Sequence, residues 1–284
     1  MTTSPEREPR SGLDEPPEAL SRDALSYLSL LLERDVSKTP MGELRPVVDG
    51  HAAARLRGSR HRAILDLVDG GSVLDIGCDI GVLAKAISPR AAYVLGVDVR
   101  PETILIARHF FAAPNIEYRE GSFPRLDPGR AFDCAILLET IEHVEDPVAT
   151  LTRIRQCLRP GGTLVISTPN ALSYHEALRQ LARLWPSFRS DRGIRRLAAR
   201  IAIEVPGTGT QEDHIYSWTW ETLCRLAHRT GFRYLDHRRA SFGPPSLPLG
   251  SGRVWPFGRG ELAFLRPLVG PFCQTLMLKL KAVG

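Results

Sequence analysis

The chain has 284 residues and a net charge of +5; it is 43% hydrophobic and 24% charged, the balance of a globular protein with one large core and an appendage. Its best apolar run, residues 262–276, is broken by an arginine, two prolines and a glycine, so we expect no membrane-spanning helix. Because the N-terminal residues are polar and acidic and the five cysteines lie far apart without a CxxC pattern, we also expect no signal peptide and a reduced, cytoplasmic protein.

The first seventy residues predict an N-terminal helical cap. Residues 1–18 are rich in Pro, Glu, Arg and Ser, and we expect them to form a disordered tail. Helices are predicted over 20–32, where leucines recur at helical spacing, and over 51–68. Between them, residues 40–50 carry two prolines and two glycines, which predicts a loop. The cap therefore spans 19–69, and the main domain is expected over 70–284.

After the cap, short apolar runs alternate with helical patterns. The runs predict strands over 73–76, 93–97, 116–119, 132–138 and 163–167, with helices over 82–87, 101–111 and 147–158 between them. A helix over 219–230 and strands near 232–237 and 273–280 follow. Strands that alternate with helices of this size are typical of parallel crossover units, in a sheet that helices cover on both faces.

The stretch from Val73 to Gly81 joins a buried strand to a helix through a Gly-x-x-x-Gly turn. Glycines let backbone N–H groups approach a ligand closely, and a helix N-terminus favours a carboxylate or phosphate, although such turns also serve ordinary packing. Asp98 ends the next strand about twenty residues later. An acidic residue there accepts hydrogen bonds from ribose hydroxyls or, alternatively, caps the following helix. The two features together favour a nucleoside site at the carboxyl ends of these strands.

These motifs resemble those of class I S-adenosylmethionine-dependent methyltransferases, and in particular the ubiquinone-biosynthesis type of O-methyltransferase. Residues 73–81 are similar to the family's first motif, 95–98 to its second strand with the ribose acid, and 132–136 to its fourth strand. The sequence LRPGGTLVI over 158–166 resembles the family's turn into strand five. The resemblance implies an α/β fold: a doubly wound, mostly parallel seven-stranded sheet with helices on both faces and an antiparallel last strand.

The resemblance also implies that S-adenosylmethionine is the cofactor, and two positions depart from the family pattern. Asp79 stands in place of a glycine, and Ser122 in place of an acid that binds the adenine amino group. Asp tolerates unusual backbone conformations; its carboxylate repels the cofactor's carboxylate but can pair with its amino group. The implied cofactor contacts are Asp75, Gly77, Cys78, Asp79, Gly81, Asp98, Val99, Ser122, Phe123, Leu138 and Glu139.

Candidate catalytic residues follow the fourth strand, between Glu139 and His143. Methyl transfer is an in-line displacement, so the enzyme mainly positions the acceptor and removes its proton. An imidazole has a pKa suited to this step, so His143, together with Glu142, is the candidate base toward a hydroxyl acceptor. The alternative is that Glu142 and His143 only cap the following helix, while Glu139 meets the cofactor or a backbone amide.

The same segment reads E-x-x-E-H, two carboxylates and an imidazole within one turn, which suits Mg²⁺ or Mn²⁺. It resembles the motif of ubiquinone-pathway O-methyltransferases and of small-RNA terminal 2′-O-methyltransferases, in which a later histidine completes the ligand set. The resemblance therefore implies a metal site of Glu139, Glu142, His143 and His214. The alternative is that His214 only lines the pocket.

The net charge is concentrated in residues 176–203, where seven arginines against two acidic residues leave a local charge of +5. This segment belongs to an insertion over 172–209, which we expect to form a helical lid beside the acceptor pocket. A basic amphipathic segment also suits contact with an anionic membrane surface, or with the phosphates of a nucleotide, a nucleotide-sugar or RNA.

Three functions remain open from the sequence. The first is methyl transfer to a small-molecule acceptor, at a hydroxyl oxygen. The second is a metal-dependent RNA ribose 2′-O-methyltransferase that uses the four implied metal ligands. The third is a non-catalytic protein that binds S-adenosylmethionine, which the irregular residues Asp79 and Ser122 would fit.

Overall fold

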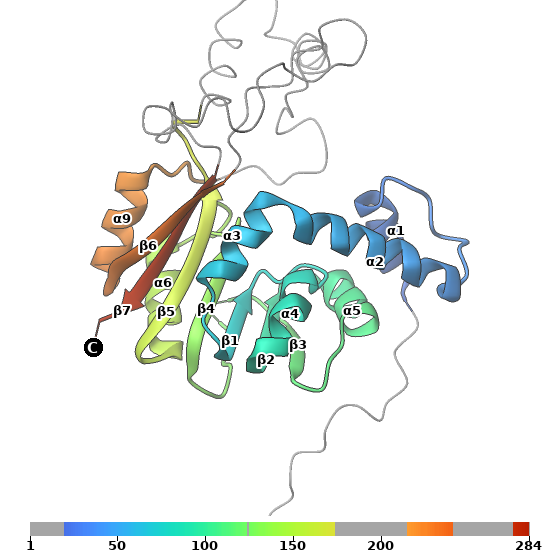
Figure 1. Ribbon diagram of the computed structural model, residues 1–284, viewed down its shortest axis with the longest axis horizontal. Helices are drawn as coiled ribbons and strands as arrows, with labels where there is room; N and C mark the ends of the chain where they lie inside the picture. Colours follow the sequence, from blue (N-terminus) through green and yellow to red (C-terminus); the bar gives the residue numbers. More distant parts are fainter. Residues whose placement is uncertain (1–19, 124, 174–214, 241–274, 284) are drawn as a thin grey trace, which may run out of the picture.

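The computed structural model describes residues 20–123, 125–173, 215–240 and 275–283. A seven-stranded sheet forms its centre, in the order β3-β2-β1-β4-β5-β7-β6 (Figure 1). The first five strands pair in parallel, and β7 pairs antiparallel with both β5 and β6. The predicted sheet is therefore confirmed. The strands are β1 (Gly71–Ile76), β2 (Ala91–Asp98), β3 (Ile116–Glu120), β4 (Phe132–Leu138), β5 (Leu158–Pro169), β6 (Phe232–Ala240) and β7 (Thr275–Ala282).

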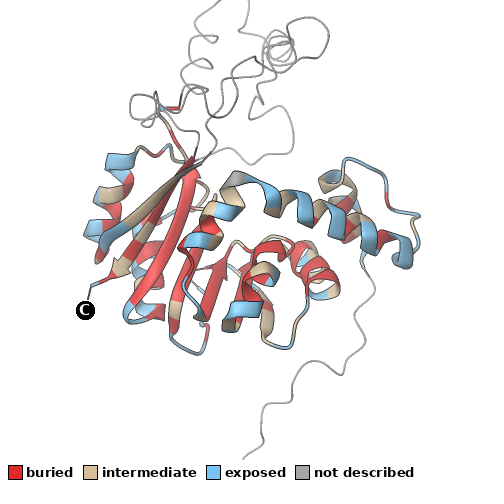
Figure 2. Cartoon of the chain, in the orientation of Figure 1, coloured by how far each residue is buried: buried red, intermediate tan, exposed pale blue. Residues whose placement is uncertain are grey.

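Helices cover both faces of this sheet, because successive strand residues are apolar and point to opposite sides. Val73 and its β2 partner Val94 belong to one hydrophobic core, and the next pair, Leu74 and Leu95, belongs to the other. The strands at the centre of the sheet are mostly buried (Figure 2). The first core contains residues of α1 (Arg22–Leu31), α2 (Met41–Arg57), α3 (Ser59–Leu67), α4 (Val82–Ile87) and α5 (Pro101–Phe110). The second contains residues of α6 (Pro147–Cys157) and α9 (Trp220–Arg229); the short 3₁₀ helix η1 (Ser88–Arg90) follows α4.

The loop predicted over 40–50 is wrong, because α2 starts at Met41 and runs through Pro46. Leu44, Val48 and Ala52 follow at successive turns of this helix and are buried in the core, so their burial outweighs the cost of the proline. The single helix predicted over 51–68 is also wrong. Gly58 has an extended backbone, with ψ 143°, and divides the segment into α2 and α3.

The Pro-Gly-Gly segment predicted as a turn before the fifth strand lies inside β5 itself. The pairing of β4 with β5 passes from Phe132–Leu158 to Cys134–Thr163, so the fifth strand carries extra residues. Gly161 has φ +77°, the left-handed conformation that such a bulge requires. The extra residues therefore change the register without interrupting the strand.

Several predicted features lie outside the described residues: the tail 1–18, the lid from residue 174 onward, the arginine-rich segment 176–203, and His214. Among the helices that are described, none combines the length and the apolar character needed to cross a membrane. Cys78, Cys134, Cys157 and Cys224 are free thiols.

Candidate functional site

The predicted cofactor loop, residues 77–81, leaves the carboxyl end of β1. Because β1 lies between β2 and β4, the chain connections diverge here, which is where open α/β sheets bind ligands. Gly77 has φ +73° and Gly81 φ +84°. A Cβ on Gly77 would lie 2.5 Å from Thr140 Oγ1, and one on Gly81 would lie 2.5 Å from Tyr118 Oη. Both positions therefore require glycine, for backbone conformation and for close packing.

Asp98, the predicted ribose acceptor, is brought into contact with this loop. Its Oδ2 accepts a hydrogen bond from the Asp79 amide at 2.9 Å, and its Oδ1 accepts one from the Arg100 amide at 3.0 Å. The residue is only 7% exposed. Each carboxylate oxygen has a second lone pair, so Asp98 still has acceptor capacity.

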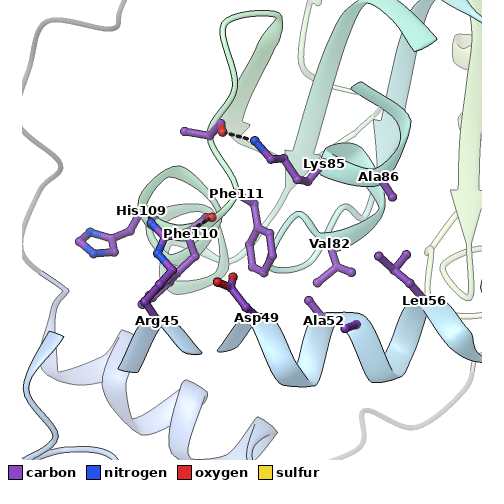
Figure 3. Close-up of a pocket in the computed structure, with 12 residues that line it drawn as sticks. Arg45, Asp49, Ala52, Leu56, Val82, Lys85, Ala86, His109, Phe110 and Phe111 are labelled. Atoms are coloured by element: carbon purple, nitrogen blue, oxygen red, sulfur yellow. Dashed lines mark hydrogen bonds between the residues drawn. The ribbon is translucent and has the colours of Figure 1, made fainter. Parts of the chain in front are cut away.

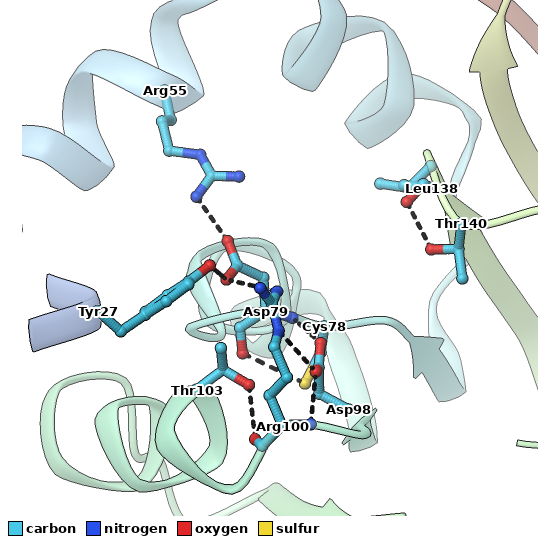
Figure 4. A network of polar contacts seen from close by, with 9 residues as sticks. All are labelled: Tyr27, Arg55, Cys78, Asp79, Asp98, Arg100, Thr103, Leu138 and Thr140. Atoms are coloured by element: carbon cyan, nitrogen blue, oxygen red, sulfur yellow. Dashed lines mark hydrogen bonds and ion pairs between the residues drawn. The ribbon is translucent and has the colours of Figure 1, made fainter. Parts of the chain in front are cut away.

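Asp79, which stands where the family has a glycine, has a left-handed backbone conformation, with φ +50°. Its carboxylate accepts hydrogen bonds from Tyr27 Oη and from Arg55 Nη1, both at 2.9 Å (Figure 4). Arg100 Nη2 lies 3.7 Å from Oδ1. The sequence did not point to these three partners, since they lie in other segments and belong to no motif; the only signal was an acidic residue at a glycine position.

Asp75, near the end of β1, and Cys78, on the cofactor loop, are both buried. Burial, and then the nearby Asp98 and Asp79 carboxylates, raise the pKa of Asp75 to about 7. Burial also raises the pKa of the Cys78 thiol well above its usual range. The end of β1 therefore gathers three carboxyl groups, of which Asp79 is paired with Arg55 and lies 3.7 Å from Arg100. Of the other predicted cofactor contacts, Phe123 is only 9% exposed, whereas Val99 is 60% exposed.

The segment after β4 forms the second half of the site. Glu139 has φ +46°, and its carboxylate accepts hydrogen bonds from Ser167 Oγ at 2.6 Å and from Arg60 Nη1 at 3.2 Å. Since Thr140 contacts Gly77, this segment lies directly beside the cofactor loop. The sequence predicted Glu139 here but neither of its partners.

Glu142 is almost fully buried, at 1% exposed. Thr168 Oγ1 donates to its Oε2 at 2.9 Å, and within the described residues its Oε1 has no hydrogen-bond partner. Burial, and then the Glu139 carboxylate, raise the pKa of Glu142 to about 7. Its backbone carbonyl accepts from the amides of Ile215 and Tyr216, so Glu142 also fixes the chain as it approaches α9. His143, half-buried, follows it directly.

A separate groove of ≈ 490 Å³ lies between α2 and the helices α4 and α5 (Figure 3). Arg45 of α2 donates to the carbonyls of Phe110 and His109, and Lys85 of α4 donates to the carbonyl of Ala112. All three carbonyls lie at the C-terminal end of α5, where cations satisfy otherwise unpaired acceptors. The charged rim of this groove therefore supports the fold, and none of the predicted site residues lines it.

Comparison with known proteins places the chain in a family. A family model described as a methyltransferase domain matches residues 48–237. The ubiquinone biosynthesis O-methyltransferase of Xanthomonas campestris pv. campestris (strain B100) is 30% identical over 217 residues, which cover 72% of this chain and 86% of that protein. The chain belongs to the class I S-adenosylmethionine-dependent methyltransferases. It is an enzyme, and S-adenosylmethionine is its cofactor, so a non-catalytic role is no longer an alternative.

Solved methyltransferase structures share the fold. An S-adenosylmethionine-dependent methyltransferase from Mesorhizobium loti superposes with a TM-score of 0.50 at 21% identity, over 78% of this chain and 94% of that one. A methyltransferase in complex with the Haloferax volcanii Trm112 methyltransferase activator superposes with a TM-score of 0.53 at 17% identity, over 84% of this chain and 96% of that one. At these identities the likeness concerns the fold alone.

The metal site implied by the resemblance is not assembled by the part of this methyltransferase that the structure describes. No three or more of its described His, Cys, Asp or Glu residues are grouped so that they could hold a metal ion. Glu139 is bound to Arg60 and Ser167, whereas Glu142 is buried against Thr168, so their carboxylates have separate partners. His214, the fourth implied ligand, lies outside the described residues.

Proposed function

We propose that this methyltransferase transfers the methyl group of S-adenosylmethionine to a hydroxyl oxygen of a small-molecule acceptor. The observation that supports this most is the position of the segment that carries Glu142 and His143: it follows β4, and its Thr140 lies against Gly77 of the cofactor loop after β1. The 30% identity to a protein named ubiquinone biosynthesis O-methyltransferase supports oxygen as the accepting atom.

In this proposal the ends of β1 and β2 hold the cofactor. Asp98 accepts hydrogen bonds from the ribose hydroxyls with its remaining lone pairs, and the backbone at Gly77 and Gly81 approaches the bound molecule closely. The acidic end of β1 suits the positive charges of a sulfonium and an ammonium. The further contacts are those implied by the motif: Asp75, Cys78, Asp79, Val99, Ser122, Phe123, Leu138 and Glu139.

When bound, the cofactor supplies an electrophilic methyl carbon on a sulfonium sulfur. His143 accepts the proton of the acceptor hydroxyl as the new oxygen–carbon bond forms and the sulfur–carbon bond breaks. The electron pair of the broken bond stays on sulfur, leaving S-adenosylhomocysteine. Glu142 holds the loop that carries His143, through Thr168 on β5 and the backbone at 215–216.

The cofactor half is tested by calorimetric titration with S-adenosylhomocysteine. We expect Asp98→Ala to weaken binding by at least about tenfold, because it removes a bidentate acceptor of ribose hydroxyls. Asp127→Ala, which removes an exposed carboxylate paired only with Arg153 among the salt bridges of the described residues, is the matched control. Equal affinities of the two variants would refute the ribose role of Asp98.

The acceptor half is tested with a cofactor that carries a deuterated methyl group, incubated with a panel of phenols and then with cell extract. Mass spectrometry identifies the molecule that gains the label, and its fragmentation identifies the accepting atom. With that acceptor, His143→Ala is expected to lower kcat by about 10²-fold. A loss of tenfold or less would refute His143 as the base. The alternative that Glu142 and His143 cap the following helix is already wrong, because Asp146 caps α6 by accepting a hydrogen bond from the Ala149 amide. Label on nitrogen or carbon would refute oxygen transfer.

We also propose that the chain is divided, at the boundary between α3 and β1, into a helical cap over 19–69 and a catalytic domain over 70–284. A cytoplasmic location is consistent with the four free thiols among the described residues, since a reducing compartment keeps cysteines in this state.

A further inference from the structure

Asp79 is the point at which the N-terminal helices meet the cofactor loop. A non-glycine residue with φ +50° is strained, and such strain persists where the surrounding contacts hold it. Here the contacts come from the Asp79 side chain itself, which binds Tyr27 on α1 and Arg55 on α2. These partners precede Asp79 by 52 and 24 residues, so the carboxylate joins segments that are remote in sequence.

The same network reaches the candidate ribose acceptor. The Arg100 guanidinium lies 4.9 Å from the centre of the Tyr27 ring, and its Nε lies 3.6 Å from Asp98 Oδ1 (Figure 4). Burial and the Asp79 carboxylate raise the pKa of Tyr27 far above its usual range, so its hydroxyl stays protonated and donates. Tyr27, Arg55, Asp79 and Arg100, called the Asp79 latch below, therefore surround the point where the cofactor loop meets Asp98.

The polar contacts of the Asp79 latch are weak enough to break and re-form while the protein stays folded. The side chains of Asp79, Arg55 and Arg100 are 24%, 32% and 38% exposed, and ion pairs at such exposure are weak individually. Ala24 and Leu28 are the two buried residues of α1, so few fully buried apolar side chains oppose a small movement of this helix when the polar contacts break. A small opening of α1 and α2 away from the loop is therefore far easier than unfolding.

We propose that the Asp79 latch closes α1 and α2 over the cofactor loop, and that its opening admits the cofactor and releases the product. The inference rests on the proposed role of Asp98 as the ribose acceptor. Asp98 is 7% exposed and the Arg100 Nε lies 3.6 Å from its Oδ1, so a ribose hydroxyl that reaches this oxygen has to displace the Arg100 side chain, which lies over the Tyr27 ring. The aspartate in place of glycine thereby makes the N-terminal helices a part of cofactor exchange.

The latch itself is tested without any ligand, by hydrogen exchange of the full chain. Tyr27→Phe and Asp79→Asn are compared with wild type, and Tyr234→Phe serves as a control because its hydroxyl bonds to His237 on β6. We expect the backbone amides of residues 21–31 to exchange about two- to tenfold faster in the first two variants and unchanged in the control. Unchanged exchange in both latch variants would overturn the proposal.

The role of the Asp79 latch in cofactor entry and product release is tested by surface plasmon resonance, with S-adenosylhomocysteine and the same proteins. The association and dissociation rate constants are both expected to rise about two- to tenfold in Tyr27→Phe and Asp79→Asn, with a smaller change in Kd. Faster amide exchange with unchanged rate constants would overturn the gating role. If wild type binds no S-adenosylhomocysteine, the proposed cofactor site is wrong, and the ligand-free exchange still decides whether the latch exists.

Discussion

Glu142 predicts an unusual pH dependence of stability. A carboxyl group that is paired in the folded state usually has a lowered pKa, whereas the pKa of Glu142 is raised. Burial and the neighbouring Glu139 raise its pKa from 4.5 to about 7. The folded protein thus retains this proton to a higher pH than the unfolded chain does. The resulting stabilisation is complete below about pH 4.5 and is lost as the pH rises through about 7. Glu142→Gln, which cannot ionise, lacks this loss.

The size of the effect follows from the displaced pKa. At about 1.4 kcal/mol for each tenfold change in proton affinity, the ionised Glu142 destabilises the fold by roughly 3 kcal/mol at alkaline pH. The glutamine N–H that replaces Oε1 meets no partner among the described residues, a cost of about 1–3 kcal/mol that does not depend on pH. The difference between the free energies of unfolding of Glu142→Gln and of wild type should therefore shift in favour of the variant by up to about 3 kcal/mol as the pH rises from about 5 to about 8.

Urea unfolding followed by circular dichroism, at several pH values across this range, measures the difference. Asp75, whose pKa is also raised to about 7, titrates in both proteins and cancels in the comparison. Parallel pH profiles for wild type and Glu142→Gln would show that Glu142 is ionised throughout. The argument for its burial-driven protonation would then be wrong.

Three further outcomes are expected. Gly81→Ala should destabilise the fold by about 2–4 kcal/mol in urea unfolding, because φ +84° is unfavourable and the new Cβ meets Tyr118; a loss under about 0.5 kcal/mol would contradict this. Asp133→Asn should cost about 1 kcal/mol at neutral pH and less below about pH 4, because hydrogen bonds from Ser72 and then Arg159 hold the pKa of Asp133 low; an equal cost at both pH values would contradict it. Methyl transfer should be unaffected by EDTA, because Glu139 is bound to Arg60 and Ser167 while Glu142 is buried against Thr168, so the two carboxylates are held separately. Loss of activity that Mg²⁺ or Mn²⁺ restores would reinstate the metal site.

The central strands and the cofactor loop could be predicted because local sequence determines them. Residues 132–138 form β4 with the predicted bounds, since an apolar run of that length, interrupted only by Asp133, suits a strand buried on both faces. The loop wrongly predicted over 40–50, where α2 lies, has a non-local cause. Leu44 and Val48 are buried against helices far along the chain, and only that packing makes a helix of a segment with a proline and two glycines.

The positions of the site were predictable, but their electrostatics were not. Asp98 and Glu142 follow strands, and parallel strands bring their carboxyl ends to one edge, so proximity followed from topology. The pKa of Glu142 depends on its burial and on the short distance to Glu139. Arg60, which neutralises Glu139, comes from α3, and no motif announces it.

Two strained acidic residues now explain why the N-terminal helices belong to the catalytic unit. Among the described residues, the non-glycine positions with positive φ are Glu33, Asp79 and Glu139, and the last two stand at the ends of β1 and β4. Each binds an arginine of the cap: Asp79 binds Arg55 of α2, and Glu139 binds Arg60 of α3. Without these helices, Glu139 would lose Arg60 and Asp79 would keep only Arg100, at 3.7 Å, so repulsion from the neighbouring carboxyl groups would act on already strained loops. The cap therefore supplies positive charge that offsets the repulsion among the carboxyl groups at this edge of the sheet and helps the two loops keep their shape.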